Sequence, residues 1–390
     1  MNQRGGHCLP FFKINTMKKV LIIVSLFVLP LAYSFAQGCM EPTSSTGGPT
    51  IIGYIQPEFK YSILGDNVDG TSKNQMSFGF RRARIGVAGN IPYDFSYYVL
   101  AELSTFQNGP YLLDAFITYN RFKPWFKISM GQFKKPFGLE LGATGCQDLY
   151  TVNRSKVVNE LTSPDRDLGI MVSGTSGTAK IFGLEKENLL SYSLSVTNGT
   201  GKNTLDIDRA KDIIGRIVIA PFESISIGGS YQFGKAVNPD PTVKDMDERM
   251  RWGADLTLKK YNFIFQAEYV FGQDKGSKLI GGGCGATPEL VAGNFKSNGY
   301  YAQLMYNTPW KLMPLVKYET YDPDMDKEDF DHTAYRVSTM TFGLNYYPND
   351  WARVQINYLY NIESSSSTDI VNYNETSNDL FYIQLQVKIN

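Results

Sequence analysis

The side chains of this sequence that could do chemistry are mainly arginines and lysines. Arg82 and Arg84 alternate along one segment. Five more cations lie in or beside the long stretch 135–165: Lys134, Lys135, Arg154, Lys156 and Arg166. Guanidinium and ammonium groups hold anions through charge-assisted hydrogen bonds. Because the stretch also carries Glu140, Asp148, Glu160 and Asp165, the sequence predicts only a modest attraction for anions.

Nucleophilic catalysis and metal binding have few candidate residues. The two histidines are His7 and His332, so a Ser/His/Asp triad would depend on His332, with Asp331 and Ser338 as poor partners. An acidic run from Asp322 to Asp331 has alternate carboxylates, but it lacks the central glycine of a calcium loop. That run is better interpreted as a solvated external face. We therefore predict no enzyme activity, no metal site and no cofactor.

The composition requires a large folded structure. The 390 residues include 43% hydrophobic and 14% aromatic side chains, which is too apolar for a disordered chain. The 38 basic and 38 acidic residues balance, whereas a nucleic-acid-binding protein usually carries a basic excess. A role in nucleic-acid binding is therefore not expected.

The N-terminal segment is typical of an export signal. Met17, Lys18 and Lys19 precede an apolar run too short to span a bilayer as a helix, and small residues follow at Ser34 and Ala36. We predict that residues 1–36 are a signal peptide with its true start at Met17, and that residues 37–49 are a flexible leader. Cys39 leaves a lipoprotein alternative open, although the usual leucine three residues before it is missing.

The rest of the chain alternates apolar and polar residues. In residues 189–197, for example, one face is Leu190, Tyr192, Leu194 and Val196, and the other is serine and threonine. A period of two predicts β-strands with one apolar and one hydrated face. About 16 such segments begin near residues 50, 76, 93, 110, 124, 166, 188, 210, 223, 249, 261, 297, 313, 335, 351 and 378.

The links between these strands alternate in length. Links such as 90–92, 221–222 and 259–260 are short, whereas those at 135–165, 235–248, 273–296, 322–334 and 363–377 are long. Outer-membrane barrels have short periplasmic turns and long external loops, and a soluble sandwich has no reason to separate them. We therefore predict that residues 50–390 form an all-β, transmembrane antiparallel barrel of about 16 strands. The longest link, 135–165, is expected to fold back into the lumen.

Parity along the strands indicates which charges face the lumen. The inward cations are Arg82, Arg84, Lys127, Arg216, Arg251, Lys317 and Arg353. The inward carboxylates are Glu58, Glu102, Asp114, Asp167, Asp255, Glu268 and Glu319. The predicted pore-lining set that attracts anions is Arg82, Arg84, Lys134, Lys135, Arg154, Lys156, Arg166, Arg216, Lys317 and Arg353. Alternatively, Arg82 and Arg84 pair with acids on neighbouring strands, which would fix strand register and leave the channel unselective.

Two cysteines fall in predicted loops. Cys146 and Cys284 could form a bridge in an oxidising compartment, and an unbridged pair is an equal alternative.

Several runs resemble the phosphate-selective porin O and P family. They are Phe80-Arg81-Arg82-Ala83-Arg84-Ile85, then residues 131–140 from Gly131-Gln132-Phe133 to Glu140, then Arg166-Asp167-Leu168-Gly169. Later segments at 198–199, 212–221 and 317–323 resemble the family in the same order. The resemblance implies a 16-stranded outer-membrane barrel, usually trimeric, that passes small solutes passively. In members that choose phosphate, arginine ladders and a lysine cluster hold the anion at the constriction.

The functional prediction is an outer-membrane porin. It would lie in outer-membrane lipid as a homotrimer and allow small hydrophilic solutes to diffuse, with anions such as phosphate as a candidate class. The alternative is a non-conducting outer-membrane barrel that binds a ligand or partner through its external loops.

Overall fold

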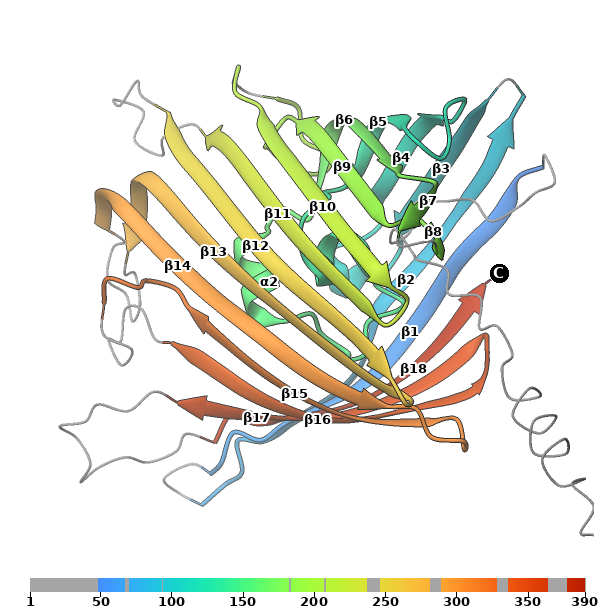
Figure 1. The fold of residues 1–390 in the computed structure, drawn as a ribbon. Coiled ribbons are helices and arrows are strands. Elements are labelled where there is room, and N and C mark those ends of the chain that lie inside the picture. The colour runs from blue at the N-terminus through green and yellow to red at the C-terminus, as the bar shows by residue number, and fades with distance from the viewer. Residues whose placement is uncertain are drawn as a thin grey trace, which may run out of the picture. The chain divides into compact units, whose positions relative to one another are not determined.

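The computed structural model describes a closed antiparallel barrel of sixteen strands (Figure 1). The described residues are 48–66, 70–92, 94–181, 184–206, 208–236, 246–280, 289–327, 336–363 and 377–389. The predicted signal peptide, most of the predicted leader, Cys39, Cys284 and His332 lie outside them. Among the described residues, no helix is long and apolar enough to cross a membrane.

The barrel strands follow one another around the ring in chain order. Their bounds are β1 (Thr50–Ser62), β2 (Gln75–Ile91), β3 (Phe95–Glu102), β4 (Tyr111–Tyr119), β5 (Lys127–Lys134), β6 (Arg166–Thr175), β9 (Leu190–Thr197), β10 (Asp212–Phe222), β11 (Ile225–Ala236), β12 (Asp247–Lys260), β13 (Phe263–Ile280), β14 (Glu289–Tyr306), β15 (Leu312–Asp322), β16 (Val337–Asn349), β17 (Ala352–Glu363) and β18 (Leu380–Ile389). A separate hairpin, β7 (Thr178–Ile181) and β8 (Leu184–Glu187), lies within the link from β6 to β9. The prediction of an all-β barrel of about 16 strands is confirmed.

Closure comes from pairing between the first and last strands. The β1–β18 register runs from Gly53 opposite Ile389 to Ser62 opposite Leu380. Because every barrel strand has a partner on both sides, no strand leaves an open edge in the lipid.

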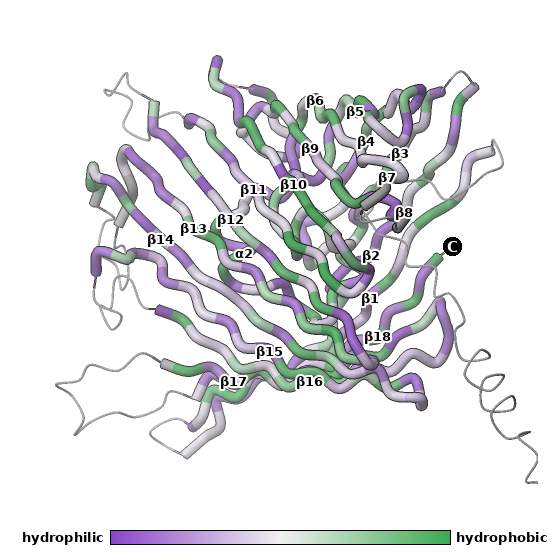
Figure 2. The backbone as a smooth tube through the Cα atoms, viewed as in Figure 1, coloured by the Kyte–Doolittle hydropathy of each residue, from purple (hydrophilic) through white to green (hydrophobic). Residues whose placement is uncertain are grey.

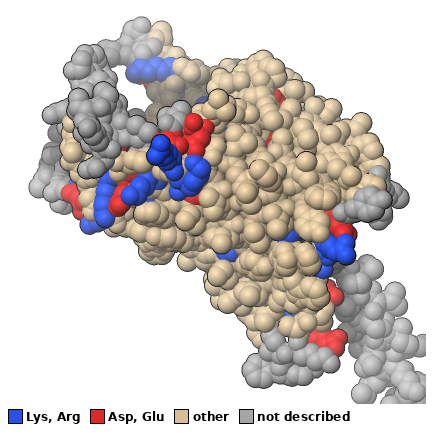
Figure 3. Space-filling view, turned by 90° about the horizontal axis from the view of Figure 1, so that it is seen from above, with Lys and Arg blue, Asp and Glu red and all other residues tan. Residues whose placement is uncertain are grey.

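The two faces of the wall differ as the alternation predicts. On β10, Ile213, Ile217 and Ile219 are exposed on the outside, whereas Asp212 and Arg216 are buried on the inside. Hydrophobic and hydrophilic residues alternate along most strands (Figure 2). One outer face is nearly free of charged side chains, which gather toward its ends (Figure 3). An uncharged outer belt suits a hydrocarbon environment.

Most strand boundaries agree with the predicted ones, with one clear exception. The predicted link 273–296 is wrong, because β13 continues to Ile280 and β14 starts at Glu289. The two strands pair throughout this stretch, from Gln273 opposite Lys296 to Ile280 opposite Glu289. Side chains such as Asp274 and Lys275 are polar there, so the apolar alternation ends while the backbone ladder continues.

The link 135–165 enters the lumen, as predicted. It contains a π-helical turn, η2 (Gly138–Ala143), and a short helix, α2 (Lys156–Leu161). An apolar cluster joins it to the inner wall: Phe137, Leu141, Val157, Val158 and Leu161 pack with Ile214, Val270 and Tyr301. We call residues 135–165 the lumen loop. Its burial against the wall stabilises it through the hydrophobic effect.

Candidate functional site

A cationic cluster lies where the lumen loop approaches β2 and β5. We use this name for Arg82, Arg84, Lys134 and Arg154, whose charges all act on the Cys146 thiol. Arg154 Nη2 lies 3.1 Å from Cys146 Sγ. Burial alone would raise the pKa of Cys146, but the four cations outweigh burial and hold this pKa well below its usual value.

The two arginines of β2 have different partners. Arg84 Nε donates to Glu102 Oε2 at 2.7 Å across the β2–β3 pair, and Arg84 Nη1 donates to the Tyr54 hydroxyl at 2.7 Å. Arg82 Nη1 instead donates to the neutral Gln56 Oε1 at 2.8 Å. The strand-pairing alternative therefore describes Arg84, whereas Arg82 keeps a charge that is not matched by this partner.

Arg166 lies close to the cationic cluster but is held between two carboxylates. Its side chain is fully buried, with Nε 2.9 Å from Asp114 Oδ1 and Nη1 2.5 Å from Asp165 Oδ2. Asp165 also lies 3.6 Å from Arg154. These pairs fix the end of the lumen loop to the start of β6.

A carboxylate cluster lies where η2 of the lumen loop approaches the strands β12 to β15. We use this name for Glu140, Asp255, Glu268 and Glu319. Asp255 and Glu268 are opposite each other in the β12–β13 register. Two like charges so placed repel each other unless other groups compensate.

Glu268 and Glu140 fasten the lumen loop to the wall. Glu268 accepts the backbone N–H of Leu139 at 3.1 Å and of Glu140 at 3.0 Å, and the Tyr301 hydroxyl at 3.1 Å. The Glu140 side chain accepts Lys317 Nζ at 3.1 Å and the Ser155 N–H at 2.7 Å. These bonds satisfy backbone N–H groups of the lumen loop that would otherwise be buried without an acceptor.

The close approach of η2 to Glu268 requires a glycine. Gly138 has φ +69°, and a Cβ added there would lie 1.9 Å from Glu268 Oε1. No L side chain fits this conformation and this contact without displacement.

The remaining predicted cations lie apart from the cationic cluster. Arg216 pairs with Asp255 through two bonds of 2.5 and 3.0 Å, and Lys317 pairs with Glu140 and Glu319. Arg353 Nη1 donates to the Leu149 carbonyl at 2.8 Å. Lys317 and Arg353 therefore join the wall to the lumen loop, whereas Arg216 joins wall strands β10 and β12.

Lys156 and Lys135 lie on the lumen loop itself. Lys156 is half-exposed and pairs with Glu160 one helical turn away at 2.8 Å. Lys135 is buried, with Nζ 3.4 Å from Gln232 Oε1, and burial lowers its pKa to about 8.

The wall residues of the two clusters lie on opposite sides of the ring. From β2, which carries Arg82 and Arg84, the ring order reaches β12 after eight of sixteen strands. A solute in the lumen therefore has surplus cations on one side and surplus carboxylates on the other.

The sequence did not predict two parts of this site. It did not place Cys146 among the cations, because nothing periodic marks a loop residue. It also missed the apolar anchors Phe137, Leu141 and Val157, although apolar residues within a long loop are a detectable signal.

Comparisons with known proteins agree with the barrel. The family model for phosphate-selective porin O and P matches residues 57–389. Among curated proteins none matches the chain.

Solved porin structures share the fold at low sequence identity. Salmonella typhi OmpF in complex with daunomycin is 14% identical, with a TM-score of 0.60, covering 90% of this chain and 100% of that chain. An anion-selective porin from Comamonas acidovorans is 12% identical, with a TM-score of 0.57, covering 88% and 99%. The trimer form of Vibrio cholerae OmpT is 11% identical, with a TM-score of 0.56, covering 87% and 99%.

Proposed function

Because the chain belongs to the phosphate-selective porin O and P family, we propose that it is a passive outer-membrane channel in which the cationic cluster gives a modest preference for anions. Small hydrophilic solutes diffuse through the lumen beside the lumen loop, down their own gradients. No cofactor or energy source takes part.

The observation that carries the proposal is the charge balance around Cys146. Four cations converge there, and the carboxylates within 4 Å of Arg84 and Arg154 are Glu102 and Asp165. Asp165 is shared with Arg166. The surplus positive charge supports attraction of anions, since a partly screened charge in a narrow aqueous passage raises the local anion concentration.

Strict phosphate specificity receives less support. A site that strips water from phosphate needs several donors free to replace that water. Here Arg84 donates to Glu102 and Tyr54, and Lys134 donates to the Thr144 carbonyl at 2.8 Å. We therefore propose a general preference for small anions.

Planar-bilayer recording tests the proposal. Wild-type protein should give open, ohmic current steps and a reversal potential that indicates anion preference in a potassium chloride gradient. Replacing Arg82 and Arg84 by glutamine should lower the anion-to-cation permeability ratio by about fivefold or more, because one charge at 4 Å in water is worth about 1 kcal/mol. The double change Arg121→Gln and Lys123→Gln is the matched control, since both side chains are exposed on the β4–β5 link.

Two outcomes would contradict the proposal. A reversal potential that does not change in the Arg82/Arg84 variant would remove the role of the cationic cluster. Silent bilayers containing correctly folded protein would support the alternative of a barrel that binds a ligand or partner without conducting.

We also propose that the protein assembles as a homotrimer in outer-membrane lipid. The trimer form of Vibrio cholerae OmpT, which shares the barrel fold at 11% identity, supports this assembly. Native mass spectrometry of detergent-solubilised protein should give three copies per particle, and a monomer as the main species would contradict the trimer.

A further inference from the structure

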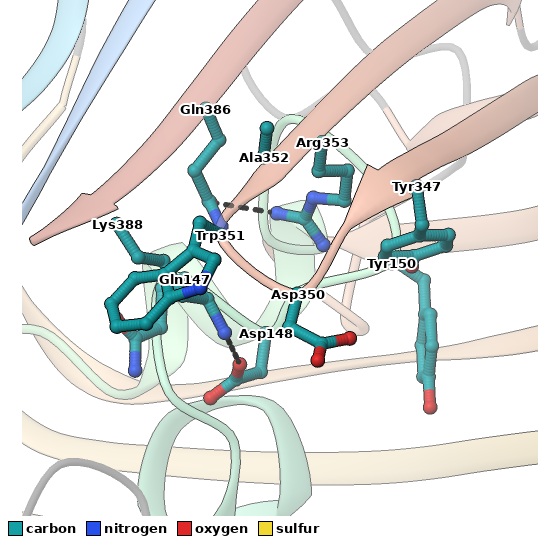
Figure 4. Close-up of a pocket in the computed structure, with 10 residues that line it drawn as sticks. All are labelled: Gln147, Asp148, Tyr150, Tyr347, Asp350, Trp351, Ala352, Arg353, Gln386 and Lys388. Atoms are coloured by element: carbon teal, nitrogen blue, oxygen red, sulfur yellow. Dashed lines mark hydrogen bonds and ion pairs between the residues drawn. The ribbon is translucent and has the colours of Figure 1, made fainter. Parts of the chain in front are cut away.

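A pocket of about 190 Å³ lies between the lumen loop and the wall formed by β16, β17 and β18, near the end of the barrel with short links (Figure 4). Gln147, Asp148 and Tyr150 of the lumen loop form one side, and the other side includes Tyr347, Trp351 and Arg353. Neither the cationic cluster nor the carboxylate cluster contributes to it.

The pocket is held in shape by bonds to the loop backbone. Arg353 and Gln355 donate to the Leu149 carbonyl at 2.8 and 3.2 Å. Asn345 donates to the Tyr150 carbonyl at 2.9 Å. A preformed pocket avoids the entropy cost of ordering its walls when a ligand binds.

Three aromatic side chains line the pocket. Tyr150 and Tyr347 pack against the buried apolar cluster of Ile264, Met305, Met313 and Leu315. Trp351 lies in the tight link between β16 and β17 and is 52% exposed. The lining therefore combines two tyrosines held in place with a tryptophan at the entrance.

The polar groups of the pocket are balanced in charge. Two carboxylates, Asp148 and Asp350, face two cations, Arg353 and Lys388. Lys388 lies 3.5 Å from Asp148, and Arg353 donates to Gln386 at 2.9 Å. A simple anion or cation gains little here, because each meets groups of its own sign.

Hydroxyl groups suit such a lining, because each one both donates and accepts hydrogen bonds. The carboxylates accept hydrogen bonds from the ligand's hydroxyl groups, and the guanidinium and ammonium groups donate hydrogen bonds to the hydroxyl oxygens. Aromatic rings contribute apolar area for the C–H face of a ring. The volume equals that of about six waters at roughly 30 Å³ each, which suits one small ring and not a chain of several.

We propose that this pocket is a binding subsite for a single neutral sugar ring. It rests on the proposed function, because the sugar reaches the pocket through the lumen. Binding is weak enough to allow release, as passage through a channel requires. The subsite gives a passive channel a preference among uncharged solutes that the cationic cluster does not provide.

Saturation-transfer-difference NMR with glucose tests the subsite on solubilised full-length protein, with no need for conduction. Wild-type protein should transfer saturation to glucose. Trp351→Ala should raise the apparent dissociation constant about fivefold or more, from loss of an aromatic contact. Trp351→Phe keeps a ring and should retain most of the affinity. Trp310→Ala is the matched control, since Trp310 is 75% exposed in the β14–β15 link at the same end of the barrel and does not line the pocket.

Asp350→Asn tests the polar half of the lining and should weaken glucose binding severalfold. The subsite is wrong if wild-type protein transfers no saturation to glucose, or if Trp351→Ala binds glucose as wild type does. In competition experiments galactose should displace glucose. The subsite is also wrong if glycine betaine or phosphate displaces glucose at a lower concentration than galactose does. Failure of glucose binding in a protein that conducts refutes the subsite alone. Glucose binding by a protein that gives silent bilayers refutes the channel and leaves the subsite supported.

Discussion

The cationic and carboxylate clusters are both groups of charged side chains on the inner side of the barrel, but they differ in what surrounds the charge. In the carboxylate cluster, Glu268 and Glu140 accept backbone N–H groups of the lumen loop. In the cationic cluster, Arg82 donates to the neutral Gln56 amide. A buried charge that is bonded to the backbone positions a segment, whereas a charge bonded to neutral side chains still acts on passing ions. Inward-facing charge alone therefore does not identify a selectivity residue.

The largest expected effect comes from loosening the carboxylate cluster. Glu268→Gln replaces one carboxylate oxygen by an NH₂ group, which cannot accept an N–H from η2. A buried N–H group of η2 left without an acceptor costs about 1–3 kcal/mol, enough to release η2 from the wall for part of the time. Single-channel recordings should show higher mean conductance and much more open-channel noise than wild type.

Two comparisons sharpen this result. Gly138→Ala should have a similar effect without any change of charge, because its Cβ collides with Glu268. Glu223→Gln removes an exposed carboxylate on the β10–β11 link and should leave conductance unchanged. Quiet, wild-type currents from both Glu268→Gln and Gly138→Ala would show that the apolar anchors alone hold the loop.

The second effect concerns Cys146 and has the opposite sign from the loss of Arg82. The four cations lower the pKa of Cys146 and so favour its thiolate form, which cancels one positive charge of the cationic cluster. Cys146→Ser therefore adds a net positive charge. The anion-to-cation permeability ratio should rise about two- to fivefold, given about 1 kcal/mol for a charge at 4 Å in water.

A reversal potential in a salt gradient measures this change. Ser keeps a small polar side chain beside Arg154, so the loop itself should be preserved. A ratio that stays at the wild-type value would mean that Cys146 carries no negative charge in the conducting state.

The strands were predictable from the sequence because lipid on one side and water on the other impose an alternation of period two. That alternation placed Arg82 and Arg84 on the inner face, where the structure buries them. It did not indicate which inward charges would be matched, since partners such as Asp114 and Arg166 come from different segments of the chain. The link 273–296 was mispredicted because strand pairing persists where the apolar alternation ends.

The lumen loop was also only partly predictable from the sequence. Its length and its position between β5 and β6 suggested entry into the lumen, but no periodic pattern orders its side chains. The contact between Glu268 and η2 depends on the conformation of Gly138, which only the folded chain reveals. Residue types therefore predicted the wall, and the contacts between wall and loop required the structure.

The smallest expected effect is a pH dependence that comes from Lys135. Burial lowers the pKa of Lys135 to about 8, so its side chain is mostly charged at pH 7 and mostly neutral at pH 9. Raising the pH across this window removes one positive charge from the lumen loop, whereas the arginines of the cationic cluster keep theirs. Anion preference should therefore fall as the pH rises, by less than about twofold because solvent and salt screen the charge. Lys135→Gln should flatten the profile of reversal potential against pH, and Lys123→Gln, at an exposed site, should leave it as in wild type. A Lys135→Gln profile as steep as that of wild type would show that a group other than Lys135 titrates. The anion preference would then depend on the cationic cluster and not on Lys135.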